Sequence, residues 1–311
     1  MSRPNSHILS ARTDRGAVRP RNEDAVLADV LPVGREFGIL LAVADGVGGH
    51  GHGDWASQRS VELLREYVGS ALAAGSDPTS SLTAAFQQVN ETVYHEAANL
   101  HPGARPATTL AAALIVGDSL WWANVGDSRV YLLGPGSARQ LTADHSLVAE
   151  QVRAGVISAE EAADAPFGNV ITRSIGFEPS VSADCGGPIA LAPGDVVLLC
   201  SDGLYRVVRE EEFASVASFY TADSAARELI AMACERGAPD NVSVVIYRVP
   251  NPLDAAEDTK RLTLAKTSKP DRTPGRRLVL WALFAAVVIV AAAAGAATAG
   301  WIPGAQLPFG G

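Results

Sequence analysis

Residues 38–50 read Gly38-Ile-Leu-Leu-Ala-Val-Ala-Asp45-Gly46-Val-Gly-Gly-His50. Six apolar residues lead into Asp45, and such a run followed by Asp-Gly is typical of a buried strand that ends in a turn. The carboxylate would then stand where carboxylate and carbonyl oxygens can bind a hard cation. Taken alone, the stretch is better explained by an Asx turn that closes a hairpin.

The same pattern occurs twice more in the chain. Residues 196–203, Val-Val-Leu-Leu-Cys-Ser-Asp202-Gly203, form a second apolar strand that leads into Asp-Gly, and residues 121–127 form a third that leads into Asp127. Turn chemistry does not readily explain three buried strands that each deliver a carboxylate at one end. The repetition therefore favours a functional cluster of acidic side chains.

Further acidic residues stand beside two other expected strands. Asp240 precedes a strand at 242–249, and Glu23-Asp24 precede one at 25–31. If these strands align, the side chains form an oxygen-rich site, and hard cations such as Mg²⁺ and Mn²⁺ prefer oxygen ligands. The sequence thus predicts a cation site that contains Glu23, Asp24, Asp45, Asp202 and Asp240.

Hydrophobic periodicity and turn signals predict that the other elements are grouped along the chain, strands with strands and helices with helices. The expected elements are strands 7–13 and 25–31, helices 54–74 and 79–100, strands 108–116, 119–125 and 129–134, short helices within 147–164, a strand near 181–186, the strand that leads into Asp202, helices 209–218 and 222–236, and the strand 242–249. Helices and strands segregated in this way predict an α+β fold with largely antiparallel sheets, not a doubly wound parallel sheet.

The charge distribution excludes one class of partner. The formal charge is −9; residues 250–277 hold seven Lys/Arg and four Asp/Glu, residues 278–311 hold none of these, and the first 249 residues therefore carry −12. Nucleic-acid binding requires a basic footprint, which so acidic a domain lacks. We expect no nucleic-acid partner. The three cysteines show no Cys-x-x-Cys spacing, and we expect them to be reduced, buried, cytosolic thiols.

The C-terminal region predicts a membrane anchor. Residues 250–277 contain four prolines and scattered charges, as in a linker, and residues 278–302 are 25 residues without a charge. A helix of that length spans roughly 37 Å, enough for a hydrocarbon core of about 30 Å. Arg276-Arg277 precede it and no basic residue follows, so the positive-inside rule predicts that residues 1–249 are cytoplasmic and that 303–311 form a short extracytoplasmic tail. In the alternative, the apolar segment packs back on the domain.

The acidic cluster predicts chemistry on phosphate. Two cations about 3.5–4 Å apart can share Asp45 and activate a water for attack on phosphorus. A guanidinium is then needed to hold the phosphate, and Arg19, four residues before Glu23, is the best candidate. The sequence contains no Gly-x-Ser-x-Gly elbow, which argues against an enzyme with a serine nucleophile.

Eight motifs in order resemble those of the metal-dependent protein phosphatase family, type 2C. They are Arg19-x-x-Asn22-Glu23-Asp24, Asp45-Gly46-Val-Gly-Gly-His50, Thr108-Thr109-Leu110, Asn124-Val-Gly126-Asp127-Ser128-Arg129, Asp144-His145-Ser146, Thr172-Arg173-Ser-Ile-Gly176, Ser201-Asp202-Gly203-Leu204 and Asp240-Asn241. The resemblance covers about residues 7–249. The linker and single span resemble those of membrane-anchored bacterial members.

The resemblance implies a fold and a set of roles. It implies a four-layer α-β-β-α sandwich whose metals lie in a cleft at one end of the sheets. Asp45 would bridge two Mn²⁺ or Mg²⁺ ions, and the Gly46 carbonyl would bind one of them. Arg19 would bind the substrate phosphate. The remaining implied ligands are Asp202 and Asp240, Glu23 and Asp24 through bound waters, and Asp127 with Asp202 at a third, weaker metal site.

Two departures from the family pattern bear on the site. Many members have Asp four residues after the aspartate of the second Asp-Gly, as a further ligand of the third metal, and this chain has Arg206. Either the third metal binds weakly or Arg206 alters the site. Eukaryotic members have a His, proposed as general acid, where this chain has Val47; His50 or water could supply the proton, and His145 is expected to be structural.

Three functions remain open from the sequence. The first is a membrane-anchored phosphoserine/phosphothreonine protein phosphatase whose partners are phosphorylated proteins, among them transmembrane Ser/Thr kinases. The second is a non-catalytic metal-binding relative of the same fold, a possibility that Arg206 keeps open. The third is an enzyme that hydrolyses a small phosphorylated metabolite.

Overall fold

The computed structural model describes residues 8–34, 36–47, 52–100, 103–163, 165 and 170–251. The chain divides into two units, Met1–Pro252 and Leu253–Gly311. The expected span 278–302, the tail 303–311 and all but the first two residues of the expected linker lie outside the described residues. Within the described ranges, no helix has both the length and the apolar character needed to cross a membrane.

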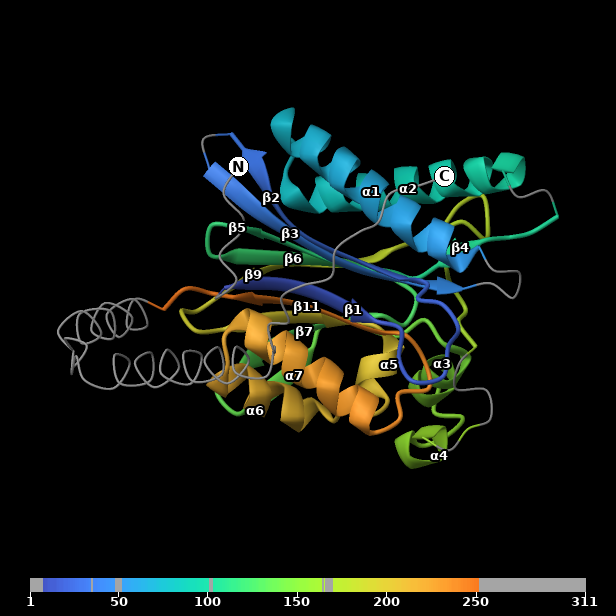
Figure 1. Ribbon diagram of the computed structural model, residues 1–311. Helices are drawn as coiled ribbons and strands as arrows, with labels where there is room; N and C mark the ends of the chain where they lie inside the picture. Colours follow the sequence, from blue (N-terminus) through green and yellow to red (C-terminus); the bar gives the residue numbers. More distant parts are fainter. Residues whose placement is uncertain are drawn as a thin grey trace, which may run out of the picture. The chain divides into compact units, whose positions relative to one another are not determined.

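Two sheets, antiparallel throughout, form the centre of the first unit (Figure 1). The first sheet contains, in spatial order, β1 (Leu9–Asp14), β11 (Val242–Arg248), β10 (Val196–Cys200), β7 (Arg129–Gly134) and β8 (Ser137–Gln140). The second contains β2 (Asp24–Val33), β3 (Glu36–Val47), β5 (Leu110–Val116), β6 (Ser119–Val125) and β9 (Asp184–Ala190), and the short β4 (Ala107–Thr108) pairs with the end of β3.

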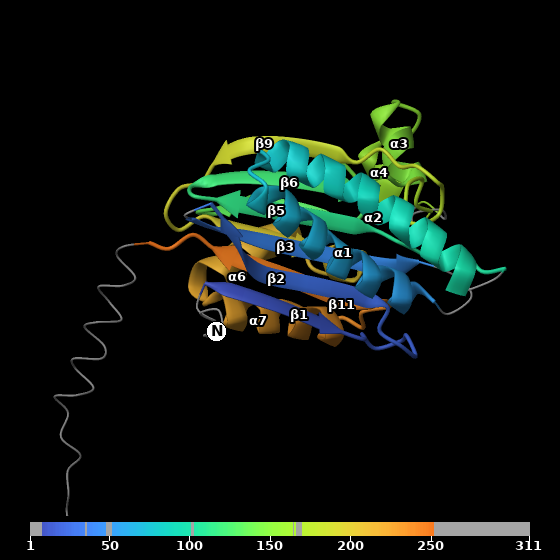
Figure 2. The ribbon, with the colours of Figure 1, turned by 90° about the horizontal axis from the view of Figure 1, so that it is seen from above.

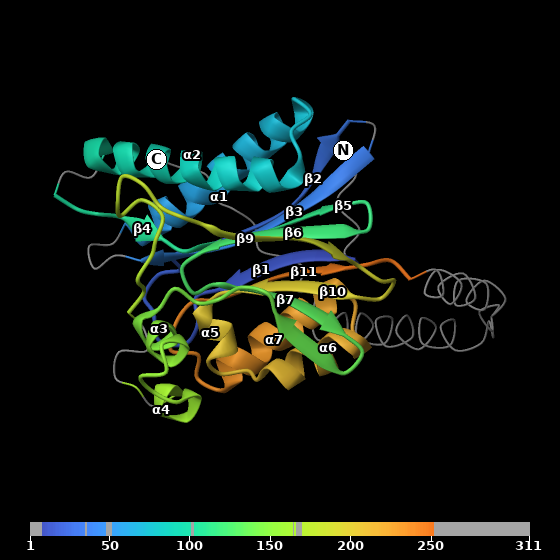
Figure 3. The ribbon, with the colours of Figure 1, turned by 180° about the vertical axis from the view of Figure 1, so that it is seen from behind.

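Helices cover the outer face of each sheet. Figure 2 shows α1 (Gly53–Ala73) and α2 (Pro78–Leu100) over the second sheet, and Figure 3 shows α6 (Glu210–Phe219) and α7 (Ala222–Glu235) under the first. Three shorter helices, α3 (Leu147–Arg153), α4 (Ala159–Ala163) and α5 (Asp202–Tyr205), complete the described part. The α+β class and the α-β-β-α layering expected from the sequence are confirmed.

The apolar run of β3 is continuous because both of its faces are buried. Leu40, Ala42 and Ala44 pack in the core shared with α1 and α2. The residues between them, Leu41 and Val43, pack in the core between the two sheets. Side chains alternate between the faces of a strand, so a strand between two cores needs an apolar residue at every position.

The strand does not end at Asp45, where the sequence predicted a turn. β3 continues through Gly46 and Val47, which pair with Thr108 and Ala107 of β4. A Cβ on Gly46 would overlap the backbone of Gly53. The Asp-Gly pair therefore serves close packing of two backbones, and the bare α-carbon of glycine permits that approach.

Other boundaries follow the sequence with local differences. β8 was not predicted, and the strand expected near 181–186 lies at Asp184–Ala190. A capping box begins α4, because the backbone N–H of Glu161 donates to Ser158 Oγ (3.2 Å) and that of Ser158 donates to Glu161 Oε2 (2.7 Å). The three cysteines are free thiols, but only Cys200 is buried; Cys185 and Cys234 are half-buried, contrary to the expectation.

Candidate active site

A cavity of about 240 Å³ lies where β3 ends and β2 begins. It brings together residues from loops and strands that are far apart in the sequence. The side chains and backbone that line it belong to Arg19, Glu23, Asp45, Gly46, Val47, Thr109, Asp127, Ile171, Asp202, Asp240 and Asn241. Every site residue predicted from the sequence, except Asp24, lines this cavity.

Asp24 lies directly behind the lining. Asp24 and Asp45 face each other in the antiparallel register of β2 and β3. The Oδ2 atom of Asp24 accepts a hydrogen bond from Ser201 Oγ (2.7 Å), whereas its Oδ1 atom is buried and has no hydrogen-bond partner. One oxygen is thus held by the protein and the other is left for a ligand.

Asp202 repeats this arrangement. It follows β10 as the first residue of α5, and its Oδ2 atom accepts from Arg206 Nε at 3.0 Å. Its Oδ1 atom is buried without a hydrogen-bond partner. A buried carboxylate oxygen left unpaired is costly, and a bound cation satisfies it.

Repulsion among the carboxylates also favours cations. Burial, reinforced by the charge of Asp202, raises the pKa of Asp24 to about 7 and that of Asp127 to about 7. Burial and the neighbouring charges of Asp24 and Asp202 hold the pKa of Asp45 well above its usual range. Divalent cations relieve such repulsion, and the all-oxygen donor set fits Mg²⁺ and Mn²⁺.

Two arginines occupy part of the acidic cluster. Within the described residues, no three acidic, histidine or cysteine side chains already converge as ligands of one ion. Asp240 is instead paired with Arg19, whose Nη2 donates to Oδ2 at 2.6 Å, and Asp202 is paired with Arg206. The residues that could hold two cations, once Asp240 is released, are Asp45, Asp202, Asp240, the Gly46 carbonyl and, through water, Glu23 and Asp24.

Arg19 lies at the mouth of the cavity, in the loop between β1 and β2. Its side chain is 51% exposed, and the hydrogen bond to Asp240 raises its pKa. An exposed guanidinium beside a cation site can turn between a carboxylate and a phosphate, since both accept bidentate hydrogen bonds.

Two uncharged residues position the acidic groups, a role that the sequence did not assign. Asn241 Oδ1 accepts the backbone N–H of Glu23 (2.8 Å). Thr109 Oγ1 accepts the backbone N–H of Asp45 (2.9 Å) and is 2.7 Å from Ser128 Oγ. The sequence offered only one indication of this role: both residues belong to the motifs of the resemblance. Asn241 follows Asp240 directly, and Thr109 hydrogen-bonds to Asp45.

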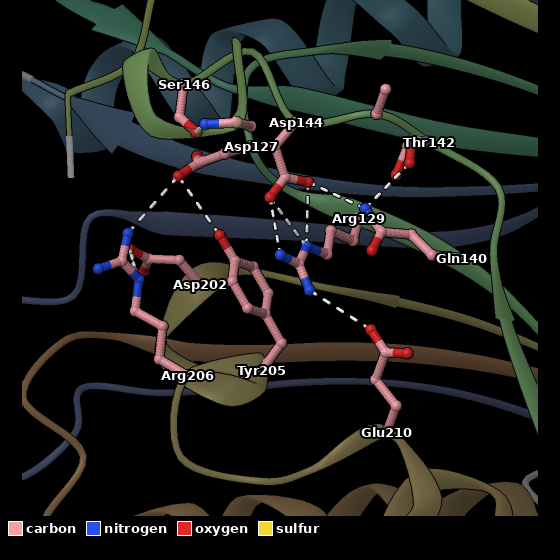
Figure 4. Close-up of polar contacts among 12 residues, drawn as sticks. Asp127, Arg129, Gln140, Thr142, Asp144, Ser146, Asp202, Tyr205, Arg206 and Glu210 are labelled. Atoms are coloured by element: carbon pink, nitrogen blue, oxygen red, sulfur yellow. Dashed lines mark hydrogen bonds and ion pairs between the residues drawn. The ribbon is translucent and has the colours of Figure 1, made fainter. Parts of the chain in front are cut away.

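A second network, also unassigned from the sequence, supports Asp127 (Figure 4). Asp127 is buried, and its Oδ2 atom accepts a hydrogen bond from Tyr205 Oη (3.4 Å). The guanidinium of Arg129 lies 3.6 Å from the centre of the Tyr205 ring and forms a bidentate pair with Asp144 (Nε–Oδ1 3.0 Å, Nη2–Oδ2 2.7 Å). Arg129 thus fixes the ring whose hydroxyl reaches Asp127.

His145 is buried and holds a loop, as expected of a structural residue. Its Nδ1 accepts the backbone N–H of Gly126 (3.1 Å), so the neutral ring carries its proton on Nε2, which lies 3.1 Å from Asp184 Oδ2. Burial lowers the His145 pKa. His50, the other histidine considered from the sequence, lies outside the described residues.

Comparisons with known proteins agree with this geometry. The sequence profile of protein phosphatase 2C matches residues 19–233. The serine/threonine phosphatase stp of Listeria innocua is 37% identical over 240 residues, which cover 76% of this chain and 93% of that protein.

Solved structures are similar over the same region. The crystal structure of the serine/threonine phosphatase PstP/Ppp of Mycobacterium tuberculosis has a TM-score of 0.69 at 34% identity, over 78% of this chain and 98% of that one. The catalytic domain of PstP in complex with two manganese ions has a TM-score of 0.67 at 34% identity, with the same coverage of 78% and 98%.

Proposed function

The chain belongs to the protein phosphatase 2C family, and from that premise we propose that its acidic cavity hydrolyses phosphoserine and phosphothreonine in proteins with two Mn²⁺ or Mg²⁺ ions. One observation carries the proposal. Asp202 in the cavity and Asp24 directly behind its lining each keep one buried carboxylate oxygen without a partner, and the cavity also contains Asp45, Asp240 and Arg19.

The residues divide the work as follows. Asp45, Asp202, Asp240 and the Gly46 carbonyl would hold the ions directly, and Glu23 and Asp24 would act through water. When bound, the two ions lower the pKa of a water molecule and neutralise charge on the phosphate. Thr109 and Asn241 keep the backbones of Asp45 and Glu23 in place. Arg19 leaves Asp240 and binds the phosphate.

An adjoining groove supports a protein substrate over a small metabolite. A hollow of about 490 Å³ shares Val47 and Ile171 with the acidic cavity, and its wall includes Arg105 and Phe177. The Arg105 guanidinium lies 5.6 Å from the centre of the Phe177 ring. A peptide that presents its phosphate to the cavity has room in this groove for the neighbouring residues.

The direct test is hydrolysis of a phosphothreonine peptide by the full-length chain. We expect turnover with Mn²⁺ or Mg²⁺ and none with EDTA, and a higher kcat/KM for the peptide than for free phosphothreonine. Absence of turnover with both metals would favour the non-catalytic relative. Equal kcat/KM for both substrates would favour the small-metabolite enzyme.

Removal of the Arg19 guanidinium should weaken substrate binding. Arg19→Ala should raise KM by about 10- to 100-fold, with a smaller fall in kcat, because a hydrogen bond to a charged group contributes about 1.5–3 kcal/mol. Steady-state kinetics on the phosphopeptide measure both constants. Arg21→Ala removes the same charge from an exposed position of the same loop and should leave KM unchanged. An unchanged KM in Arg19→Ala would remove Arg19 from the phosphate site.

The proposal includes attachment to the inner face of a membrane by residues 278–302. Its support is the 25-residue stretch without charge, the preceding Arg276-Arg277 and the proline-bearing linker. A helix that is apolar on every side must be buried on every side. Tethering would raise the effective concentration of the phosphatase near membrane-bound phosphoproteins, so transmembrane Ser/Thr kinases are proposed partners.

Membrane fractionation tests the anchor. We expect the intact protein to stay with the membranes after washes with high salt and alkaline carbonate, because a spanning helix is held by the hydrocarbon core. Protease should remove the catalytic domain only after the cells are opened. Release of the intact protein by carbonate would refute the span.

A further inference from the structure

Arg206 lies between two of the acidic residues of the site (Figure 4). It follows α5 directly, four residues after Asp202. Its Nε atom is 3.0 Å from Asp202 Oδ2, and its Nη2 atom is 3.8 Å from Asp127 Oδ2. Only 29% of the side chain is exposed, against 7% for Asp127 and 12% for Asp202. One guanidinium thus bridges two buried carboxylates from segments that are far apart in the sequence.

This position does not fit a divalent cation. A metal ligand needs a free lone pair, which the carboxylate and carbonyl oxygens preferred by Mg²⁺ and Mn²⁺ have, whereas arginine offers only N–H donors and no acceptor. The guanidinium stays protonated at every pH at which the protein is folded, so it cannot become a ligand. It also repels a second positive charge from the same place.

The surroundings hold Arg206 in this bridge. Tyr205 Oη reaches the same Asp127 oxygen at 3.4 Å, and the Tyr205 ring is covered by Arg129. Arg206 takes Oδ2 of Asp202 and leaves Oδ1 as the buried oxygen without a partner. The ion pair therefore occupies Asp202 Oδ2 and leaves Asp202 Oδ1 available to a ligand.

We propose that Arg206 is a built-in replacement for a third metal ion: its guanidinium neutralises Asp127 and Asp202, so the chain binds two divalent cations and no third. The inference rests on the proposed function, because the two cations are those of the acidic cavity. Asp127 is then a partner of Arg206 and no metal ligand. Arg206 is a positioning residue, which fixes Asp202 with one oxygen for the cavity.

The test counts Mn²⁺ ions bound to the full-length chain by equilibrium dialysis. The wild type should bind two, and Arg206→Asp should bind three, because the substitution turns a cation into a carboxylate beside two others. The matched control is Arg227→Asp, which changes the charge equally in another pair four residues apart, Asp223–Arg227, on the surface of α7. It should bind two ions, like the wild type.

A second variant, with thermal unfolding as a second measurement, keeps the inference testable if Arg206→Asp does not fold. Arg206→Gln shortens the side chain, removes the charge and adds an amide oxygen that can act as a ligand. Its affinity for a third Mn²⁺ should therefore be at least about tenfold higher than that of the wild type. Without metal, both Arg206 variants should have a lower Tm than the wild type, and Mn²⁺ should raise their Tm by more. Arg227→Asp should show neither effect.

The outcomes separate this inference from the proposed function. Three ions in the wild type, or two in both Arg206 variants at millimolar Mn²⁺, would overturn the role of Arg206 and leave a two-metal phosphatase intact. No bound Mn²⁺ in the wild type would contradict both. Two ions in the wild type and three in Arg206→Asp are the result that the bridge requires.

Discussion

An Asp45→Asn variant is expected to lose phosphatase activity by about a thousandfold or more, which corresponds to a barrier higher by about 4 kcal/mol. Asp45 is the one carboxylate proposed to contact both ions, so its loss removes a ligand from each of them at once. Asn has the same shape, and the backbone N–H at position 45 still has Thr109 Oγ1 as its acceptor. The loss should therefore be chemical and not structural.

Stability measured without metal separates these two explanations. The pKa of Asp45 is held high by burial and by the charges of Asp24 and Asp202, which means that the ionised form is destabilised in the fold. Neutral Asn removes that repulsion. In EDTA, Asp45→Asn should have a Tm equal to or above that of the wild type, while Mn²⁺ raises its Tm much less.

The control is Asp118→Asn, which makes the same exchange in the exposed turn between β5 and β6. It should keep wild-type kcat/KM and the full Mn²⁺-dependent rise in Tm. Substantial turnover by a well-folded Asp45→Asn protein would contradict the shared-ligand role of Asp45.

Gly203→Ala is expected to destabilise the domain by about 3 kcal/mol or more, the upper range for overpacking of a closely packed site. A Cβ at this position would overlap the carbonyl oxygen of Asn241. That oxygen belongs to the backbone and cannot rotate away. Either α5, which carries Asp202, or the segment directly before β11, which carries Asp240, must move, so Mn²⁺ affinity should fall as well.

Gly69→Ala provides the matched comparison. Gly69 lies inside α1, and the nearest atom to an added Cβ is Leu31 Cδ2 at 3.9 Å. Alanine in the interior of a helix is favoured over glycine by about 0.5–1 kcal/mol, so this variant should be as stable as the wild type or more so. Guanidinium denaturation without metal measures both variants. Equal midpoints for Gly203→Ala and the wild type would show that the two backbones do not need the close approach.

Local patterns in the sequence determined the elements and the candidate ligands. The apolar run of β3 and the periodicity of α1 and α2 follow from which faces must be buried, and burial leaves a direct trace in residue type. The acidic residues could be recognised because each stands beside a predicted strand. Their number was informative, since a single Asp-Gly pair is explained by a turn.

The tertiary structure decided what the local pattern left open. Asp45 lies within β3 and not at its end, because Gly46 and Val47 find partners in β4, and strand pairing depends on a segment distant in the sequence. Asn241 and Thr109 became positioning residues for the same reason, since a hydrogen bond to a remote backbone has no local signature.

Arg206 shows the division most clearly. In the sequence, Arg206 differs from the Asp of many family members. The sequence did not decide whether this difference weakens the binding of a third metal or alters the site. The spacing of Arg206 from Asp202 permits an ion pair within one turn, but only the fold brings Asp127 to the other side of the guanidinium. The charge of a residue is fixed by its chemistry, whereas the charges that it must balance are fixed by which loops meet in space.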